Sequence, residues 1–282
     1  MAEKLKSPRP FPILCDVELT NLCNFRCGMC PVGRGVLMRP QGCMGLDLLK
    51  KIVDECAANN CAVRLVRWGE PLVHPDFRQA LRIVKDAGLL CHINTNGYFL
   101  DYGLSCAIRQ IELDSIKFSF QGTDEKGYKK FRGPHWGEII TILKHFHALR
   151  GDREKPFISV GTTITDENDE RVEIFKDFVK PYCDKFTVGK TRNIVGRDGE
   201  KGCFPECPEV FDKMSIDWDG NVVACCSDYD RFMTIGDANK NTLTEIWNDG
   251  RLKWYREALV AGRHGELTLC SICCANKPME RK

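Results

Sequence analysis

The sequence of 282 residues lacks several features that point to common classes of protein. No stretch approaches the roughly 18 apolar residues of a membrane-spanning helix, and the first residues, MAEKLKSPRPFPIL, contain no apolar stretch long enough for a signal peptide. A formal net charge of +2 gives no broad basic field, which argues against a nucleic acid partner. No internal repeat, low-complexity tract or phosphate-binding glycine motif occurs. We therefore expect a cytoplasmic protein that binds neither membranes nor nucleic acids.

Cysteine, in contrast, is abundant, with 17 residues. An odd number in a chain without an export signal argues against a closed set of disulfides. Four cysteines within apolar patterns are expected to be small buried side chains, namely Cys56, Cys61, Cys91 and Cys106. The cysteines at 23–30, 203–226 and 270–274 lie in turn-rich segments, where packing gives little reason for them.

Extended apolar segments alternate with helical patterns between residues 15 and 190. We expect strands at 15–20, 61–68, 90–96, 115–122, 157–165 and 183–190. Helices are expected at 45–57, 75–88, 138–150 and 171–182. This alternation predicts parallel strands joined by crossover helices. Six such units are too few to close an eight-unit barrel, so the expected fold is α/β, a partial (βα)6 barrel with its chemistry at the C-terminal ends of the strands.

A stretch rich in glycine and charge at 191–206 marks the expected boundary between two domains. We place the barrel domain at 1–195 and a small cysteine-rich domain at 196–282. The second domain should contain a hairpin at 213–226, because Asp219-Gly220 is a typical hairpin turn. A helix is expected at about 242–261.

Cys23, Cys27 and Cys30 directly follow the first expected strand, where a barrel loop would hold ligands. A structural zinc ion takes four protein ligands, and only three occur here. A cubane iron–sulfur cluster takes thiolates at such short spacings, and three thiolates leave one iron open to a substrate.

The triplet resembles the signature of the radical S-adenosylmethionine (SAM) superfamily, and further segments match in order. In that family the open iron binds the amino and carboxylate groups of SAM, and reduction cleaves SAM to methionine and a 5′-deoxyadenosyl radical. Trp68-Gly69-Glu70-Pro71 resembles the segment that contacts the methionine amino group, with Trp68 in place of a glycine. Asn96 in Asn94-Thr95-Asn96-Gly97 also matches. The resemblance implies that Ser119 and Arg132 hold the methionine carboxylate and that Met29 lies near the adenine.

Four later cysteines could ligate a second site completely: Cys207, Cys225, Cys270 and Cys273. Zinc is a competing interpretation, since four cysteines can hold it. The segment from Gly220 to Cys225 resembles the start of the auxiliary-cluster domain called SPASM, in the shortened form called a twitch domain. The resemblance implies a second [4Fe–4S] cluster without a free iron, which would transfer electrons.

The spacings are similar to those of the radical SAM dehydrogenases of the butirosin type, which oxidise 2-deoxy-scyllo-inosamine. This implies oxidation of a secondary alcohol in a small polyhydroxylated substrate (a sugar, aminosugar or cyclitol), with a low-potential electron donor such as flavodoxin or ferredoxin. Arg192 falls where such an enzyme places a substrate-binding arginine, and a solvated linker arginine is the alternative. Asp16 and Glu18 share one face of the first strand and are candidate substrate ligands by position.

Cys226 leaves a second reaction open. Adjacent residues on a strand point to opposite faces, so Cys226 should not bind the cluster that Cys225 binds. A thiol at the barrel mouth could return a hydrogen atom to a substrate radical, which would make the protein an epimerase of a sugar or a peptide. A Cys226 that only fills space is the simpler interpretation of this residue. For the whole chain, a peptide-modifying enzyme and a non-catalytic iron–sulfur carrier also stay open.

Overall fold

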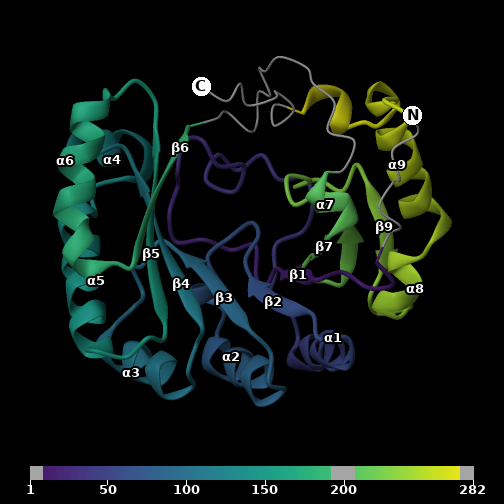
Figure 1. Cartoon of the computed structure of the whole chain (residues 1–282), viewed down its shortest axis with the longest axis horizontal. Coiled ribbons are helices and arrows are strands. Elements are labelled where there is room, and N and C mark those ends of the chain that lie inside the picture. Colours follow the sequence, from purple (N-terminus) through teal and green to yellow (C-terminus); the bar gives the residue numbers. More distant parts are fainter. Residues whose placement is uncertain (1–8, 192–206, 274–282) are drawn as a thin grey trace, which may run out of the picture.

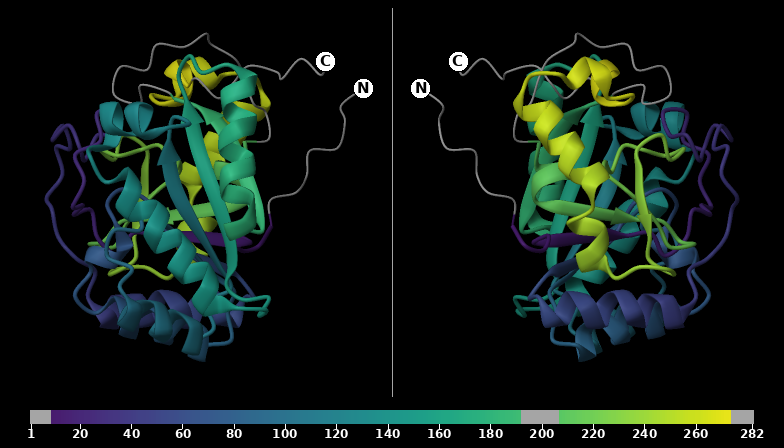
Figure 2. Two further views of the ribbon diagram at one scale, coloured as in Figure 1. Left: turned by 90° about the vertical axis from the view of Figure 1, so that its left-hand side faces the viewer. Right: turned by 90° about the vertical axis from the view of Figure 1, so that its right-hand side faces the viewer.

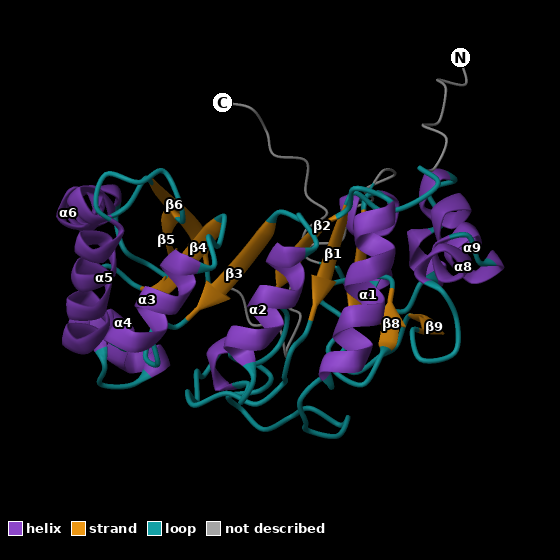
Figure 3. Cartoon of the chain, turned by 90° about the horizontal axis from the view of Figure 1, so that it is seen from below, coloured by secondary structure: helices purple, strands orange, loops and turns teal. Residues whose placement is uncertain are grey.

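The computed structural model describes residues 9–191 and 207–273, and its central element is a nine-stranded sheet (Figure 1). Six strands form the parallel part: β1 (Leu14–Val17), β2 (Ala62–Leu65), β3 (Cys91–Thr95), β4 (Ser115–Gln121), β5 (Phe157–Ile164) and β6 (Lys185–Lys190). Each expected strand of the barrel is therefore present. The order β6-β5-β4-β3-β2-β1-β7-β8-β9 has two free edges, and Figure 3 shows the strands in a curved row. The predicted partial barrel is confirmed.

Six helices connect these strands: α1 (Leu46–Ala58), α2 (Phe77–Asp86), α3 (Tyr102–Gln110), α4 (Glu125–Arg132), α5 (Trp136–Arg150) and α6 (Asp169–Val179). The sequence predicted α1, α2, α5 and α6 but not the other two. Helix α4 buries only Tyr128, so it has no apolar stripe to recognise. Its start is set by the Asp124 side chain, which accepts a hydrogen bond from the Gly127 N–H. Asp101 caps α3 in the same way.

The two faces of the sheet differ in chemistry because side chains alternate along each strand. One face packs on the helices and is apolar; it includes Cys15, Val63, Ile93, Ile116 and Val160. The opposite face, which we call the inner face, carries polar and charged side chains, including Asp16, Arg64, His92, Asn94, Lys117 and Ser119. The parallel strands thus bring polar groups to one surface beside the loops at their C-terminal ends.

The C-terminal part extends this sheet. Strand β7 (Lys213–Ile216) pairs in parallel with β1, and β8 (Asn221–Val223) and β9 (Thr234–Asp237) follow in antiparallel pairing. The predicted hairpin is present, with Gly220 at φ 91° in its turn. Figures 1 and 2 show α5 and α6 covering one end of the molecule and α9 the other. The expected domain boundary at 195/196 lies outside the described residues.

The prediction of one continuous helix at about 242–261 is wrong. The structure has two helices here, α8 (Leu243–Trp247) and α9 (Gly250–Val260), preceded by the short helix α7 (Pro208–Phe211). The side chain of Asp249 accepts a hydrogen bond from the Arg251 N–H and so starts a new helix. Trp247 is fully buried and donates to the Arg9 carbonyl oxygen at 2.7 Å. In the described residues no helix combines the length and the apolar character needed to cross a membrane.

Three of the four cysteines expected in the core are there. Cys56, Cys61 and Cys91 are buried, whereas Cys106 on α3 is partly exposed. The thiols of Cys15, Cys56 and Cys61 lie within 4.8 Å of one another, and Cys61 Sγ is 3.6 Å from Cys15 Sγ. They lie on the helix-packed face of the sheet, away from the inner face.

Candidate active site

The loops after β1–β4 enclose a cavity of about 310 Å³. The predicted triplet, Cys23, Cys27 and Cys30, lines it. So do all the residues predicted to bind SAM: Met29, Trp68, Gly69, Glu70, Asn96, Ser119 and Arg132. The structure therefore brings together residues that are up to about a hundred positions apart in sequence.

Hydrogen bonds shape the loop that carries the triplet. The Cys30 N–H donates to the Cys27 carbonyl oxygen at 3.1 Å, and the Phe25 N–H donates to Cys23 Sγ at 3.4 Å. The Gly28 N–H donates to the carbonyl oxygen of Phe131, which fixes the loop to the end of α4. These hydrogen bonds fix the course of the loop that carries the three thiols.

The three thiols do not converge as ligands of a single ion would. Within the described residues, the sulfur atoms of Cys23, Cys27 and Cys30 do not form a group lying within 4.8 Å of one another. Each thiolate of a cubane binds a different iron, so wider spacing fits a cluster better than zinc. Burial raises the pKa of Cys23 to about 12 and also raises that of Cys27, so ligation must displace protons.

Glu70 anchors the segment that follows β2. Its carboxylate is 3% exposed and accepts hydrogen bonds from the Asn96 N–H and the Thr95 hydroxyl, each at 2.7 Å, and from the Leu72 N–H at 3.3 Å. Burial raises the pKa of Glu70 to about 7 although these donors lower it. Gly69 precedes it at φ 102°, where a Cβ would overlap the Thr20 carbonyl oxygen. With three donors in place, the carboxylate can still accept from a ligand.

Three residues in the cavity wall have buried donors without an acceptor. Among the described residues, these donors are Nε of Arg132, Nε1 of Trp68, and Nε and Nη1 of Arg67. A buried donor without an acceptor is unfavourable by about 1–3 kcal/mol. All three residues line the cavity, so a ligand with acceptor oxygens or nitrogens could satisfy these donors. Together with the three thiols, they fit a cluster with bound SAM.

The predicted auxiliary cysteines gather around the C-terminal end of the sheet. Cys207 precedes α7, Cys225 follows β8, and Cys270 begins a short 3-10 helix that leads to Cys273. Burial raises the pKa of Cys207 to about 11, and Cys273 is near enough to add to this. Within the described residues, these sulfur atoms also do not form a group lying within 4.8 Å of one another, as the ligands of a single ion would. Their roles as ligands remain predictions.

Of the two residues predicted to act on the substrate, Arg192 and Cys226, the structure describes only Cys226. Arg192 lies outside the described residues. The expectation that Cys226 points away from Cys225 on a strand is wrong, because β8 ends at Val223. The Cys226 thiol is half-buried and hydrogen-bonds the side chains of Cys225 and Glu209. Glu209 also accepts a hydrogen bond from Lys213 at 2.5 Å. Cys226 is therefore close to charged groups at the edge of the inner face.

Asp16 and Glu18 are both engaged in ion pairs. Asp16 makes two hydrogen bonds of 2.6 Å with Arg64, on the inner face. Glu18 makes two of 2.6 Å with Arg39, whose side chain is 3% exposed. Glu18 also accepts hydrogen bonds from the backbone N–H groups of Trp68 and Trp218. Its role is therefore to hold together the loops that carry these residues.

Sequence reasoning missed other residues of the cavity wall, above all Arg67, Gln121 and Thr163. Gln121 and Thr163 hydrogen-bond each other at 2.5 Å. Their signal was the alternation along the fourth and fifth strands, which places Gln121 on the same face as Ser119. Arg67 follows β2 and carried no such signal.

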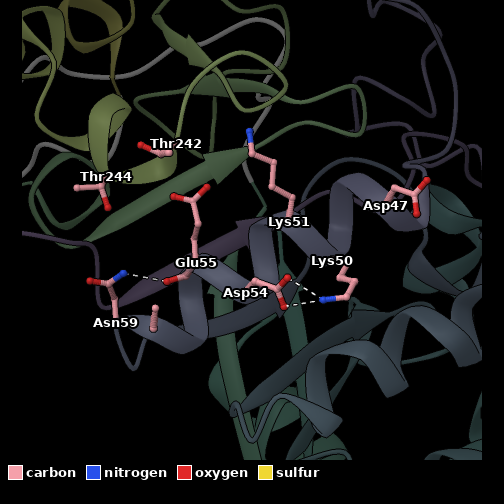
Figure 4. A pocket seen from close by; sticks show the side chains of 9 residues that line it. Asp47, Lys50, Lys51, Asp54, Glu55, Asn59, Thr242 and Thr244 are labelled. Carbon is pink, nitrogen blue, oxygen red and sulfur yellow. Dashed lines mark hydrogen bonds and ion pairs between the residues drawn. The ribbon is translucent and has the colours of Figure 1, made fainter.

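A wider, open groove of about 820 Å³ lies between α1 and the start of α8 (Figure 4). Most of its charged side chains already have partners. Lys50 pairs with Asp54 at 2.7 Å, and Lys51 donates to the carbonyl oxygens of Ala238 and Asn241. Glu55 accepts from the Leu243 N–H at 2.7 Å. These contacts join α1 to the C-terminal part, and the groove contains no cysteine.

Comparison with known proteins bears on both halves of the chain. Residues 17–179 match the radical SAM superfamily, and residues 207–274 match SPASM, an iron–sulfur cluster-binding domain. The AdoMet-dependent heme synthase of Methanosarcina barkeri is 31% identical over 167 residues, which is 59% of this chain. The match spans 46% of that relative, less than half its length.

Solved structures share the fold over nearly the whole chain. BtrN, a radical SAM dehydrogenase of butirosin biosynthesis solved with AdoMet and 2-DOIA, has a TM-score of 0.66 at 15% identity. That comparison covers 96% of this chain and 94% of BtrN. SuiB of Streptococcus suis, solved with its precursor peptide SuiA, has a TM-score of 0.75 at 16% identity and covers 96% of this chain and 72% of SuiB.

These matches confirm the predicted cofactors. A radical SAM domain uses SAM and a [4Fe–4S] cluster, and a SPASM domain holds additional iron–sulfur clusters. The residues around the cavity fit the first set, because its lining combines three cysteines with three residues whose buried donors lack an acceptor. The chain therefore belongs to the radical SAM superfamily and carries a C-terminal SPASM domain.

Proposed function

We propose that the protein oxidises a secondary alcohol of a small polyhydroxylated substrate, such as a sugar, an aminosugar or a cyclitol, to a ketone. The observation that carries this proposal is the polar lining where the cavity meets the inner face, made by Asn94, Gln121 and Thr163. Amide and hydroxyl groups donate and accept, as a hydroxyl-rich ligand requires. The likeness to BtrN over both chains supports the proposal.

When bound, the first cluster and SAM supply a 5′-deoxyadenosyl radical that removes the hydrogen atom from the carbinol carbon. The substrate radical must then lose one proton and one electron to become a ketone. The auxiliary cluster would accept the electron, because fully ligated irons would suit electron transfer, and water would accept the proton. Atoms and electrons then balance without a further oxidant in the active site.

The proposed roles follow the predicted ligand sets. Cys23, Cys27 and Cys30 hold the first cluster, and a low-potential flavodoxin or ferredoxin reduces it. The cavity residues Met29, Trp68, Gly69, Glu70, Asn96, Ser119 and Arg132 hold SAM. The auxiliary cluster is held by Cys207, Cys225, Cys270 and Cys273. Arg192 hydrogen-bonds the substrate hydroxyl, because a guanidinium donates and does not act as a base.

Epimerisation is a second candidate, favoured by one observation. Cys226 lies beside Glu209 and Lys213 at the edge of the inner face, where a thiol could return a hydrogen atom to a substrate radical. No electron would then leave the substrate, and the product would have the composition of the substrate.

The experiment is a screen of cyclitols, sugars, aminosugars and short peptides with anaerobically reconstituted, reduced protein. Oxidation predicts a product lighter by two hydrogen atoms and one 5′-deoxyadenosine per turnover. A substrate deuterated at the carbinol carbon should transfer its deuterium to 5′-deoxyadenosine. Consumption of a peptide alone, with none of the polyols converted, would contradict the proposed substrate class.

A further inference from the structure

Positive charge exceeds negative charge on and beside the inner face. Arg64 is paired with Asp16 through two hydrogen bonds of 2.6 Å, and Lys213 is paired with Glu209 at 2.5 Å. The two charges in each pair cancel. The positive charge of Lys117 on β4 has no such partner among the described residues. It has no hydrogen bond or ion pair with an acidic residue among those described. The charged groups that act on the pKa of its ammonium are themselves cations.

Those neighbours are Arg64 on β2 and Lys185 on β6. Burial lowers the pKa of Lys117, and the charges of Arg64 and Lys185 lower it further. His92 on β3 also lies nearby, and its pKa is lowered chiefly by burial. A half-buried ammonium among like charges is unfavourable unless an anion joins it.

Lys117 lies next to the residues that line the cavity. It precedes Ser119 by two positions on β4, so both side chains share the inner face. Across the sheet its register partner is Asn94, which also lines the cavity. A group bound by Lys117 would therefore lie on the inner face, next to the cavity that we propose holds the first cluster and SAM.

The course of the Lys117 side chain is defined by Gly161 on β5. A Cβ at Gly161 would overlap Cε of Lys117 and lie 2.7 Å from its Nζ. The lysine side chain thus crosses β5 at Gly161, which has no side chain to obstruct it. Its ammonium lies over β5 at Gly161 and is half-buried.

We propose that the substrate carries an anionic group, a carboxylate or a phosphate, and that Lys117 binds this group on the inner face. The inference rests on the proposed function, because the ligand is the substrate of the radical reaction. The ammonium donates charge-assisted hydrogen bonds to the anion. Asn94 then holds the hydroxyl-bearing part of the substrate nearer the cavity.

The test uses three matched probes: glycerol, glycerate and glycerol 3-phosphate. Their affinities for the reconstituted, SAM-loaded protein are measured by NMR titration. We expect one or both anions to bind at least about tenfold more tightly than glycerol, the stronger one identifying carboxylate or phosphate. Lys117→Met should weaken anion binding about 10- to 100-fold. Lys185→Met, which removes an exposed neighbouring charge, should change it by less than about threefold.

Two further variants separate position from folding. Lys117→Arg keeps the charge and should retain the preference for anions, whereas Gly161→Ala displaces the ammonium and should weaken it. Equal binding of glycerol and both anions, or unchanged anion binding in Lys117→Met, would overturn the inference. Formation of 5′-deoxyadenosine is measured in the same samples. Its absence in the wild type would contradict the proposed function, while loss of probe binding alone in Lys117→Met would support the anion-binding role of Lys117.

Discussion

Arg67, directly after β2, and Asp217, in the turn between β7 and β8, form an ion pair in which neither side chain is exposed, with Nη2 and Oδ1 2.9 Å apart. Asp217 also accepts from Arg231 Nε at 2.8 Å, and Arg39 lies 3.8 Å away. Because Arg67 immediately precedes the Trp68–Pro71 segment, the SPASM hairpin supports the wall of the cavity that the three cysteines line.

We expect Asp217→Asn to destabilise the protein strongly, because it leaves buried guanidinium groups without their counter-charge. Breaking one partner of a buried ion pair lowers the free energy of unfolding by about 3–5 kcal/mol. Urea unfolding measures it. Asp219→Asn is the matched control, since its pair with Arg231 is partly exposed and should contribute at most about 1 kcal/mol. Equal effects of both substitutions would contradict the importance of burial here.

Cys27→Ala should abolish the formation of 5′-deoxyadenosine by reduced, reconstituted protein, because only two of the three thiolates remain for the first cluster. Chromatography of the nucleoside product measures this. Cys106→Ser on α3 removes a partly exposed cysteine outside the cavity and should leave the rate unchanged. Normal product formation by Cys27→Ala would show that the triplet is not the ligand set.

Iron content tests the two sites separately. Replacing Cys23, Cys27 and Cys30 by alanine should leave about four irons per chain, the content of one cubane. Replacing Cys207, Cys225, Cys270 and Cys273 should also leave about four. If the first variant instead binds one zinc and no iron under anaerobic reconstitution, the auxiliary site is not a redox centre.

Glu70→Gln should weaken SAM binding about 10- to 100-fold, because hydrogen bonds to a charged acceptor are lost or weakened at the Asn96 N–H and the Thr95 hydroxyl. Equilibrium dialysis with labelled SAM measures the affinity. Glu55→Gln in the groove of Figure 4 is the control, since it also loses charge next to a backbone N–H but lies outside the cavity. The same SAM affinity in both variants would refute the assigned role.

Cys226→Ala distinguishes oxidation from epimerisation once a substrate is known. A dehydrogenase should still release product lighter by two hydrogen atoms, because no step needs a thiol hydrogen atom. An epimerase should instead incorporate one deuterium from deuterated water, and Cys226→Ala should stop this incorporation. Mass spectrometry of the product measures both. A product of unchanged composition that carries solvent deuterium would exclude the dehydrogenase.

Local patterns in the sequence determined much of this protein. The spacing of Cys23, Cys27 and Cys30 indicated the first cluster, and extended apolar segments between helical patterns located all six strands of the barrel. Asp219-Gly220 predicted the hairpin turn correctly. These features depend on neighbours in the chain, where residue type and spacing restrict the backbone directly.

The tertiary structure alone decided which distant groups meet. The parallel pairing of β7 with β1 places Asp217 against Arg67, and nothing local to either residue indicates that contact. Asp16 and Glu18 look equivalent on one strand, yet one pairs with Arg64 on the inner face and the other with Arg39. Such pairings follow from the register of the whole sheet and the burial it imposes on each charge, because a buried charge needs a partner that only long-range packing can supply.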